Sequence, residues 1–529
     1  MKRYRKLIYW FIIIVISILR LWLQVNLNYI VVYASIDDNI AILQTESLIN
    51  DQYLGSYNMM TLAKGYVYPF FLYACHQLHI PYCLGLGILI VLSHLMMLKA
   101  FICLTSNRRL QLIFYCVISF IPISYAFTNT LYFYRISLTA PLTLIVISCL
   151  IILYNQTSQP QIIIWSLITG ISLWCVMNCR EDSHWELAFV IYALYLFALK
   201  NLKQRSFKKV MCSFLVIVTI YYLPTFMISQ VNKKHYGISL LNDRVNGPFA
   251  SMMKLMYSVA DPNKDDDVWF TYAMLEKCID VSPSLASIVP SIDHAYHSWA
   301  YVYFPECGCI KGDFMQWVMR TALTEAGYYH NNATETLTFI ESINRELKAA
   351  FNEGKLPYDH LFHPSSSLRG ISSHDTKLII KTAAYAIESL RYPQCLFHNP
   401  QPIASDEWIK RCEAITGMSL TQESMNTSQK KQIRNVCFVL TSLYQIGSPV
   451  VSVIVLIVSL YNCFKKRKLN QVRLWVIGLL ISSMLLVAMV TIFTTFLNPI
   501  DFYKYTTPYM SIMTFIMFLL IADFLETNV

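Results

Sequence analysis

The sequence predicts an all-α polytopic membrane protein with about ten transmembrane helices and an inserted, mainly helical extracytoplasmic domain. Three observations predict this class. Of the 529 residues, 55% are hydrophobic and only 14% are charged. The mean hydropathy is +0.44. The basic residues behind the net charge of +10 lie in short runs between apolar stretches, which is the positive-inside pattern and excludes a nucleic-acid-binding face.

The first predicted span is Leu7–Val25, which follows four basic residues within Lys2–Lys6. No small-residue cleavage site follows it, so we interpret it as an anchor with a cytoplasmic N-terminus. The first outer loop is then 28–81. Its aromatic segment Tyr66–Ile80 is interrupted by Pro69 and is too short to span the bilayer, so we place it in the outer interface.

Further apolar stretches have the length that the hydrocarbon core requires. They are Tyr82–Leu104, Leu110–Phe127, Ile136–Tyr154, Ile162–Asn178, Glu186–Leu199, Val210–Ser229, Val436–Phe464, Leu474–Phe496 and Pro508–Leu525. Alternation from a cytoplasmic N-terminus places three basic loops inside, at Arg108–Arg109, Lys200–Lys209 and Lys465–Arg473. It divides the chain into an N-terminal membrane domain (1–229), an extracytoplasmic soluble domain (230–434) and C-terminal membrane helices (435–529).

The outer segment has the composition of a folded domain and contains two helical patterns. Apolar residues repeat at helical spacing over Asp313–Ala326 and again over Leu337–Phe351. We expect a helical hairpin that packs on the membrane domain and helps to shape the acceptor site. The segment also holds five cysteines, and the spacing of Cys307-Gly308-Cys309 fits a structural disulfide or free thiols better than a metal site.

Ionisable groups at the outer membrane surface are costly unless function or pairing retains them. The first group is the adjacent pair Asp37 and Asp38. Two carboxylates on a constrained loop can accept a proton from a sugar hydroxyl or hold a divalent cation. The alternative is a helix N-cap for the stretch Asn39–Ile49.

Two further charged clusters fall on the same predicted side. In the first, Arg180 can bind a lipid phosphate bidentately while Glu181 and Asp182 orient it. Its alternative is a solvated interfacial loop. The second cluster contains Tyr503 and Lys504. Because all three clusters lie on one face, we expect them to form one functional site.

Several motifs resemble a known family. The Asp37-Asp38 pair, Leu54-Gly55-Ser56-Tyr57 and the stretch Lys64–Leu72 resemble the membrane glycosyltransferases of the GT-C superfold. Relatives of that family include protein mannosyltransferases and the enzymes that add aminoarabinose to lipid A. The Arg180-Glu181-Asp182 loop and the stretch Trp317–Tyr329 resemble a poorly characterised bacterial branch of these proteins.

The resemblance implies a polyprenyl-phosphate-linked sugar as donor and a glycan, lipid or protein hydroxyl as acceptor. It also implies an active site at the outer face of a bacterial cytoplasmic membrane, with an aspartate of the first loop as the base. Asp37 or Asp38 is then the catalytic base, and Arg180 with Lys64 or Lys504 binds the donor phosphate. Glu181, Asp182 and Tyr503 support the site. Two departures leave the acceptor and metal dependence open: Asp-Asp replaces the Asp-Glu of some relatives, and Lys64-Gly65 replaces a common His-Pro.

Two other classes of function are compatible with this topology. A polysaccharide polymerase or ligase acting on lipid-linked oligosaccharides would rely more on arginines than on an early acidic pair. A lipid or glycan transporter would place charges within its spans. The predicted spans hold few such groups, namely Arg20, His94 and Lys99. We interpret His94 as a hydrogen-bonded packing residue and Lys99 as snorkelling to the interface.

Overall fold

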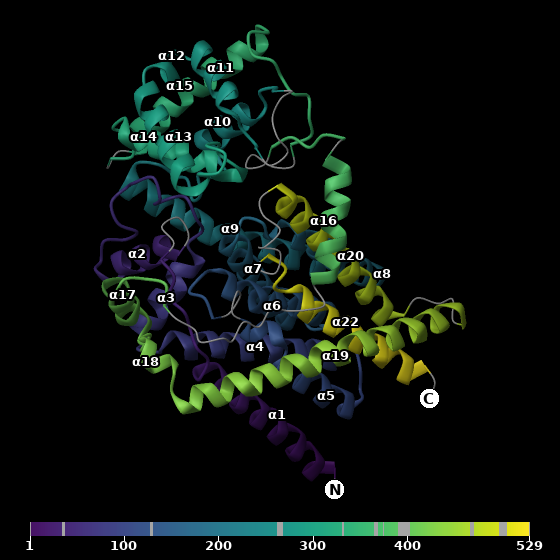
Figure 1. Cartoon of the computed structure of the whole chain (residues 1–529). Helices are drawn as coiled ribbons and strands as arrows, with labels where there is room; N and C mark the ends of the chain where they lie inside the picture. The colour runs from purple at the N-terminus through teal and green to yellow at the C-terminus, as the bar shows by residue number, and fades with distance from the viewer. Residues whose placement is uncertain are drawn as a thin grey trace.

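The computed structural model describes residues 2–33, 38–126, 131–261, 268–330, 333–363, 369–373, 375–389, 402–465, 470–496 and 505–527. Over these ranges the chain is helical, and its only extended pairings are isolated bridges such as Ile30 with Tyr132. This confirms the predicted all-α class. The long helices form a bundle in the lower part of Figure 1, and shorter helices lie above it.

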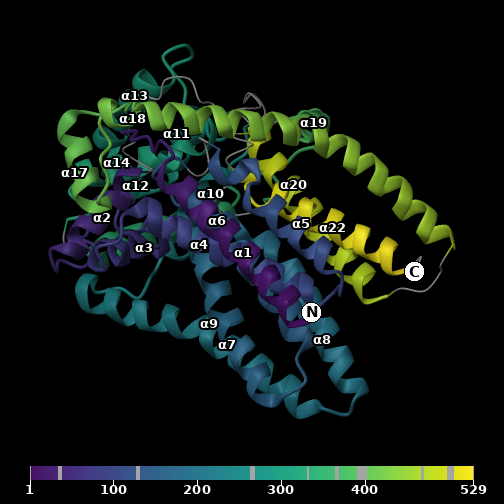
Figure 2. The ribbon, with the colours of Figure 1, turned by 90° about the horizontal axis from the view of Figure 1, so that it is seen from below.

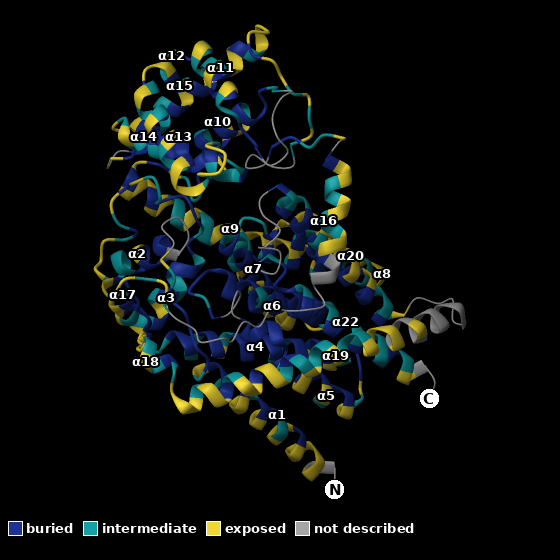
Figure 3. Ribbon diagram, in the orientation of Figure 1, coloured by how far each residue is buried: buried dark blue, intermediate teal, exposed yellow. Residues whose placement is uncertain are grey.

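Nine helices of the described chain are long and apolar enough to cross a membrane, which confirms a multi-pass membrane protein. They are α1 (Lys2–Val25), α4 (Tyr82–Ile102), α6 (Ile136–Asn155), α7 (Gln159–Cys179), α8 (Glu186–Lys203) with the preceding turn η2 (Ser183–Trp185), α9 (Phe207–Tyr236), α19 (Ser428–Lys465), α20 (Gln471–Phe496) and α22 (Tyr509–Thr527). The central helix is α6, since 94% of its apolar window is buried, against 11% for α9 and for α19. The latter two lie along opposite edges in Figure 2, and the ribbon of α19 carries many residues coloured as exposed in Figure 3.

The structure differs from the prediction at Leu110–Phe127. Helix α5 (Arg108–Ser119) has only 12 residues, and the short 3₁₀ turn η1 (Pro122–Tyr125) follows it. Proline lacks the amide that a helix needs and holds the preceding residue extended, so Pro122 breaks the predicted span. Residues 121–126 are all buried. Burial inside protein is what allows irregular backbone at membrane depth.

The loops expected to be cytoplasmic lie together at one end of the bundle. Thr105, beside the basic pair Arg108–Arg109, donates a hydrogen bond of 2.7 Å to Glu526 near the C-terminus. Gln471 at the start of α20 donates one of 2.9 Å to Asn155 at the end of α6. The helices therefore alternate in direction as the positive-inside pattern requires.

A group of short helices at the other end of the bundle forms what we call the cap domain. It comprises α10 (Gly247–Tyr257), α11 (Tyr272–Val281), α12 (Pro283–Ala286), α13 (Val289–Tyr303), η3 (Gly312–Phe314), α14 (Met315–Glu325) and α15 (Ala333–Asn352). Its core buries Trp269 and Met256 and also takes in Leu54, Tyr57 and Leu62 of the first loop. The loop and the cap domain are thus held together by one hydrophobic core.

The two helices predicted around 313–351 are present as α14 and α15, but they do not form a simple hairpin. The main neighbour of α14 is α13, and the main neighbour of α15 is α10. The prediction did not identify α13, whose Trp299 and Tyr303 contact Phe314. Cys307 and Cys309, between α13 and α14, form a disulfide, which was one of the alternatives left open.

Other helices of the predicted soluble segment lie against the bundle. The side of α20 is covered by α16 (Asp375–Ser389), whose Ala386 is buried in the core of the bundle. On the opposite flank, α17 (Asp406–Thr416) contacts α2 (Asp38–Ile49) and α3 (Val67–Gln77), and the short α18 (Gln422–Met425) leads into α19. Figure 1 shows α2, α3 and α17 side by side below the cap domain. The short length of α3 agrees with the non-spanning segment expected there.

Candidate functional site

A small cleft lies where α2, the loop before α3 and the start of α6 meet, on the side of the bundle that faces the cap domain. Its lining residues are Ile40, Ala41, Gln44, Lys64, Gly65, Tyr68, Pro69, Tyr134 and Arg135. The first two belong to the first turn of α2, which begins at Asp38. Asp38 is therefore within one helical turn of the cleft.

Lys64 brings a positive charge into this cleft. Its side chain is buried, with 6% of the residue exposed. Its Nζ donates a hydrogen bond of 3.4 Å to the Tyr134 hydroxyl. The next residue fixes the path of the loop, because a Cβ at Gly65 would lie 2.0 Å from the backbone oxygen of Asn178. Only glycine allows so close an approach, which holds Lys64 beside the end of α7.

Arg135 is the second cation of the cleft, and it forms an ion pair with Glu181. The distance from Arg135 Nη1 to Glu181 Oε2 is 2.7 Å. Glu181 also accepts a hydrogen bond of 2.9 Å from Asn242, which precedes the cap domain. Glu181 thus connects α6, the loop after α7 and the segment that leads into the cap domain.

Two effects act on the pKa of Glu181 in opposite directions. Burial alone would raise the pKa of this carboxyl group. The positive charge and hydrogen bond of Arg135, together with the charges of Arg244 and Lys64, outweigh burial and lower the pKa below its usual range. Glu181 is therefore an anion in the folded protein and serves as the counter-ion of a cationic cluster.

Arg180 is held away from this cleft by its own partners. Its Nε donates a hydrogen bond of 2.8 Å to Asp182, and its Nη2 contacts the other oxygen of that carboxylate. The guanidinium carbon lies 4.7 Å from the ring centroid of Tyr505. The expected pairing of Arg180 with a neighbouring carboxylate is thus present, but Arg180 does not line the cleft.

The cap domain reaches the same region through Trp317 of α14. This residue is 3% exposed and packs with Ile40 of α2 and Ala63 of the first loop. The Lys64 Nζ lies 5.9 Å from its ring centroid, and the Arg244 guanidinium carbon lies 5.3 Å from it. Trp317 therefore forms an aromatic wall beside the cationic cluster.

A buried ion pair fixes α14 in this position. Arg320 and Asp243 have side chains that are 0% and 2% exposed and are joined through two hydrogen bonds. Arg320 also donates a hydrogen bond of 2.7 Å to the backbone oxygen of Met59 in the first loop. The contact between the cap domain and the first loop is consequently made by charged groups with defined geometry, in addition to the shared core.

The structure brings together part of the site predicted from sequence. Lys64 and Glu181 are joined in one cluster through Tyr134 and Arg135. Asp38 begins α2, although its side chain is not described, and Asp37, Tyr503 and Lys504 lie outside the described residues. Their predicted roles stay predictions. The third charged cluster is represented by its neighbour Tyr505, which contacts Arg180.

Sequence reasoning missed Arg135, Tyr134, Asn242 and Arg244. One signal for Arg135 was available, because it is a basic residue at the end of a span that the predicted topology places outside, against the positive-inside pattern. No comparable signal marks Asn242 or Arg244, which reach the site only through the folding of a distant segment.

The described residues contain no group of three or more His, Cys, Asp or Glu side chains that could hold a metal ion. The divalent-cation alternative at Asp37 and Asp38 stays a prediction, since Asp37 is outside those residues. The polar side chains of the cleft are the cations Lys64 and Arg135, the phenols of Tyr68 and Tyr134, and the amide of Gln44. These groups suit an anionic or hydroxyl-bearing ligand.

No family model and no curated protein matches the sequence. Two solved structures are similar over most of this chain. One is the archaeal oligosaccharyltransferase AglB from Archaeoglobus fulgidus in complex with an inhibitory peptide and a dolichol-phosphate, with 12% identity, a TM-score of 0.34 and coverage of 96% of this chain. This chain spans only 56% of the length of that enzyme.

The other is ArnT from Cupriavidus metallidurans bound to undecaprenyl phosphate. It shows 9% identity and a TM-score of 0.28, and the match covers 95% of this chain and 76% of ArnT. At these TM-scores the likeness to the two enzymes assigns neither a family nor an activity to this chain.

Proposed function

We propose that the protein is a membrane glycosyltransferase that transfers a sugar from a polyprenyl-phosphate donor to a hydroxyl acceptor at the outer face of the membrane. The observation that carries the proposal is the cleft at the start of α2, which is lined by Lys64 and Arg135 and lies within one turn of Asp38. It unites cations suited to a phosphate with the helix that begins at the second residue of the acidic pair. The sequence resemblance of the first loop points to the same chemistry.

In the proposed reaction, the acceptor oxygen attacks the anomeric carbon of the donor sugar. A carboxylate of the acidic pair takes the proton of the acceptor hydroxyl as the new carbon–oxygen bond forms. The bond between the anomeric carbon and the phosphate oxygen breaks, and the polyprenyl phosphate leaves with the electron pair. Lys64 and Arg135 stabilise the negative charge that develops on this leaving group.

Glu181 has an electrostatic role in this scheme. It pairs with Arg135 on one side and accepts a hydrogen bond from Asn242 on the other, so it orients the guanidinium towards the cleft. Arg180, which is engaged by Asp182, lies next to this pair and supports the loop instead of binding the phosphate directly.

The test is sugar transfer in proteoliposomes. Purified protein receives a panel of radiolabelled polyprenyl-phosphate sugars, and release of the polyprenyl phosphate is followed. We expect Lys64→Gln and Arg135→Gln to reduce transfer by about a hundredfold or more, the effect of removing a charge-stabilising group from an active site. The matched control is Arg108→Gln, which removes a positive charge at the opposite end of the bundle and should leave transfer unchanged. Equal activity of all three variants would refute the proposal.

A second candidate is a polymerase or ligase that acts on lipid-linked oligosaccharides. The gathering of Arg135, Arg180 and Arg244 around Glu181 and Asp182 favours it, because enzymes of this class rely on arginines. The two candidates differ in the donor that they accept. The same assay separates them when a lipid-linked oligosaccharide is offered beside the lipid-linked monosaccharides.

A further inference from the structure

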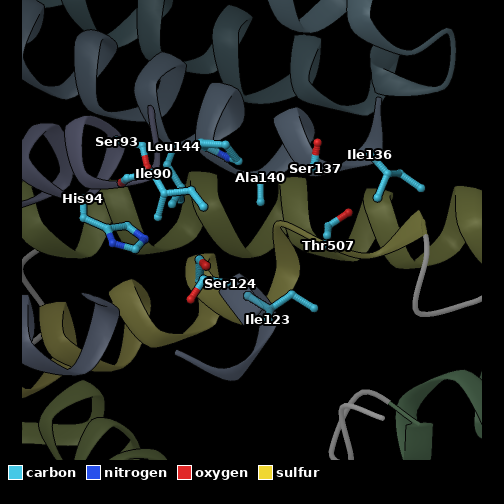
Figure 4. A pocket seen from close by; sticks show the side chains of 12 residues that line it. Ile90, Ser93, His94, Ile123, Ser124, Ile136, Ser137, Ala140, Leu144 and Thr507 are labelled. Atoms are coloured by element: carbon cyan, nitrogen blue, oxygen red, sulfur yellow. Dashed lines mark hydrogen bonds between the residues drawn. The ribbon is translucent and has the colours of Figure 1, made fainter. Parts of the chain in front are cut away.

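A second cavity lies inside the bundle, apart from the candidate active site. It has a volume of about 20 Å³ and is lined by α4, the broken segment η1, the start of α6, and the first turn of α22 with the residues before it. Figure 4 shows His94, Ser124, Ser137 and Thr507 around it, each from a different segment. Ser93 and Ser511 add two more hydroxyl groups to its wall. The wall of the cavity is mainly apolar, and these hydroxyl groups and the His94 imidazole form its polar part.

One ring nitrogen of His94, a residue of the cavity wall, makes no hydrogen bond. His94 is 2% exposed, and its Nδ1 has no hydrogen-bond partner. The interpretation of His94 as a hydrogen-bonded packing residue is therefore wrong for this nitrogen. A buried ring nitrogen without a partner costs free energy comparable to a lost hydrogen bond, so its retention beside a cavity points to a ligand.

Arg20 of α1 places a positive charge beside the same cavity. It is 0% exposed, and its Nη2 donates a hydrogen bond of 2.9 Å to the backbone oxygen of Ser124, a lining residue. The side chain of Gln24 takes a second hydrogen bond from this nitrogen. The other two nitrogens, Nε and Nη1, are buried and have no hydrogen-bond partner. Arg20 also lies near enough to His94 for its charge to act on the imidazole.

The charge of Arg20 has no carboxylate partner among the described residues. Gln24 and the Ser124 carbonyl are neutral, and the groups that act on Arg20 electrostatically are Tyr29, Tyr125 and Cys437. An unpaired charge within the membrane is expensive, because the low-dielectric interior does not replace the water that a charged group loses. A negative charge supplied by a ligand would remove this cost.

We infer that the cavity lined by His94 and Ser124, next to Arg20, binds a small monovalent inorganic anion of the size of chloride. Its volume admits roughly one water-sized particle, which excludes a sugar or a lipid headgroup. Arg20 supplies a positive charge beside the cavity, and His94, Ser511 and Thr507 are polar residues of its lining. The Ser93 hydroxyl donates instead to the backbone oxygen of Ile90. The ion would hold together α1, α4 and the irregular backbone at η1, where no helix provides hydrogen bonds. The site is independent of the proposed transfer reaction.

The test uses the full-length protein in detergent micelles at constant ionic strength. Thermal unfolding is followed by intrinsic fluorescence while chloride replaces gluconate, an anion too large for the cavity. We expect the unfolding midpoint to rise with chloride and to saturate, because a ligand that binds only the folded state stabilises it by mass action. In Arg20→Gln the half-saturating chloride concentration should rise roughly tenfold or more, because the loss of a charged contact lowers the affinity of the site for chloride.

The matched control is Lys99→Gln, which removes a positive charge from α4 at a position that contacts Trp165 and not the cavity. Its chloride response should equal that of the wild type. Crystals of the wild type grown in bromide should show an anomalous peak in the cavity lined by His94 and Ser124. An unfolding midpoint that is identical in chloride and gluconate, or a bromide crystal with only water at this place, would overturn the inference.

Discussion

Lys64 and Arg135 lie on different loops, yet both enter the cleft at the start of α2. Each is held by partners that leave it little freedom: Lys64 by Gly65 and Tyr134, and Arg135 by Glu181. Such preorganised cations can stabilise a developing phosphate charge without paying for reorganisation during the reaction. The account of function therefore depends on the positions of single side chains.

The first residue-scale prediction concerns Asp37 and Asp38, which should differ in role although they are adjacent. Asp38 begins α2, and a carboxylate at that position stabilises the free amides of a first turn, so we predict that Asp37 is the base. Asp37→Asn should lose about 10²–10⁴-fold in sugar transfer, and Asp38→Asn should stay partly active. The test measures the sugar-transfer rates of both variants at equal concentrations of folded protein. If both keep wild-type rates, the pair is structural.

The second residue-scale prediction concerns the dependence on pH of the Arg135–Glu181 pair. Because the pKa of Glu181 is lowered in the folded state, its ion pair contributes stability above the unfolded-state pKa of about 4.3, and this contribution is lost as the pH falls below that value. Glu181→Gln should cost roughly 1–3 kcal/mol at neutral pH. Unfolding curves of wild type and variant should differ by a constant amount from pH 5.5 to 8 and converge at lower pH. A difference that changes between pH 5.5 and 8 would be inconsistent with this pairing.

At the scale of elements, α14 is the part of the cap domain that reaches the cleft. Trp317 packs against Ile40 and Ala63, and Arg320 holds Asp243 and the backbone of Met59. Helix α2 thus lies between the cap domain and the bundle. A substitution that weakens the contacts of α14 with the first loop should therefore change the geometry of the cleft.

The prediction at this scale uses the buried pair of Arg320 and Asp243. Arg320→Met should destabilise the protein by about 3–5 kcal/mol, since it leaves the carboxylate of Asp243 buried without a partner. The double variant Arg320→Met with Asp243→Leu should recover most of this loss. Thermal unfolding of the purified proteins measures both. A double variant no more stable than the single one would show that the pair does not act as a unit.

The sequence predicted most elements but not all of their contacts. Apolar length was sufficient to identify α4, α6 and α20, because the bilayer sets the length of a span. It failed at Leu110–Phe127, where Pro122 divides an apolar stretch into a short helix and buried irregular backbone. The sequence analysis also missed α13 and did not identify the helices against which α14 and α15 pack. An amphipathic pattern shows which face of a helix is buried but not which element covers that face.

The candidate site was predictable only in part for a related reason. Arg180, Glu181 and Lys64 stood out as charged residues next to apolar spans. The contacts of Glu181 with Arg135 and Asn242 join three separate segments, and only the tertiary fold brings these together. Arg180 is hydrogen-bonded to Asp182, two residues further along the chain, and its role at the donor phosphate stays a prediction.

At the scale of the whole molecule, the basic loops lie at one end of the helical bundle and the cap domain lies at the other. The loop at Lys200–Lys209 lies near Tyr154 and Thr157, whereas the cap domain lies beyond the opposite ends of the same helices (Figure 1). The positive-inside pattern predicts that the cap domain and the cleft lie outside the cell, and this orientation stays a prediction. This orientation is required for a donor whose sugar is presented at the outer face.

The prediction for orientation uses two exposed positions. Cysteine introduced at Tyr301 of the cap domain, which is 81% exposed, should react with a membrane-impermeant maleimide added to intact cells. Cysteine introduced at the exposed Gln204 should react only after the membrane is permeabilised. Labelling of position 204 and protection of position 301 in intact cells would reverse the topology.

The central claim is that the cleft at the start of α2 binds the phosphate of a polyprenyl carrier. The most direct test compares binding of a polyprenyl phosphate and of the matching polyprenol, which lacks the phosphate, to the protein in nanodiscs by native mass spectrometry. The account predicts that wild type binds the phosphate roughly tenfold or more tightly, and that Lys64→Gln combined with Arg135→Gln removes the difference while Arg108→Gln keeps it. Equal affinity of the wild type for the two lipids would contradict the account.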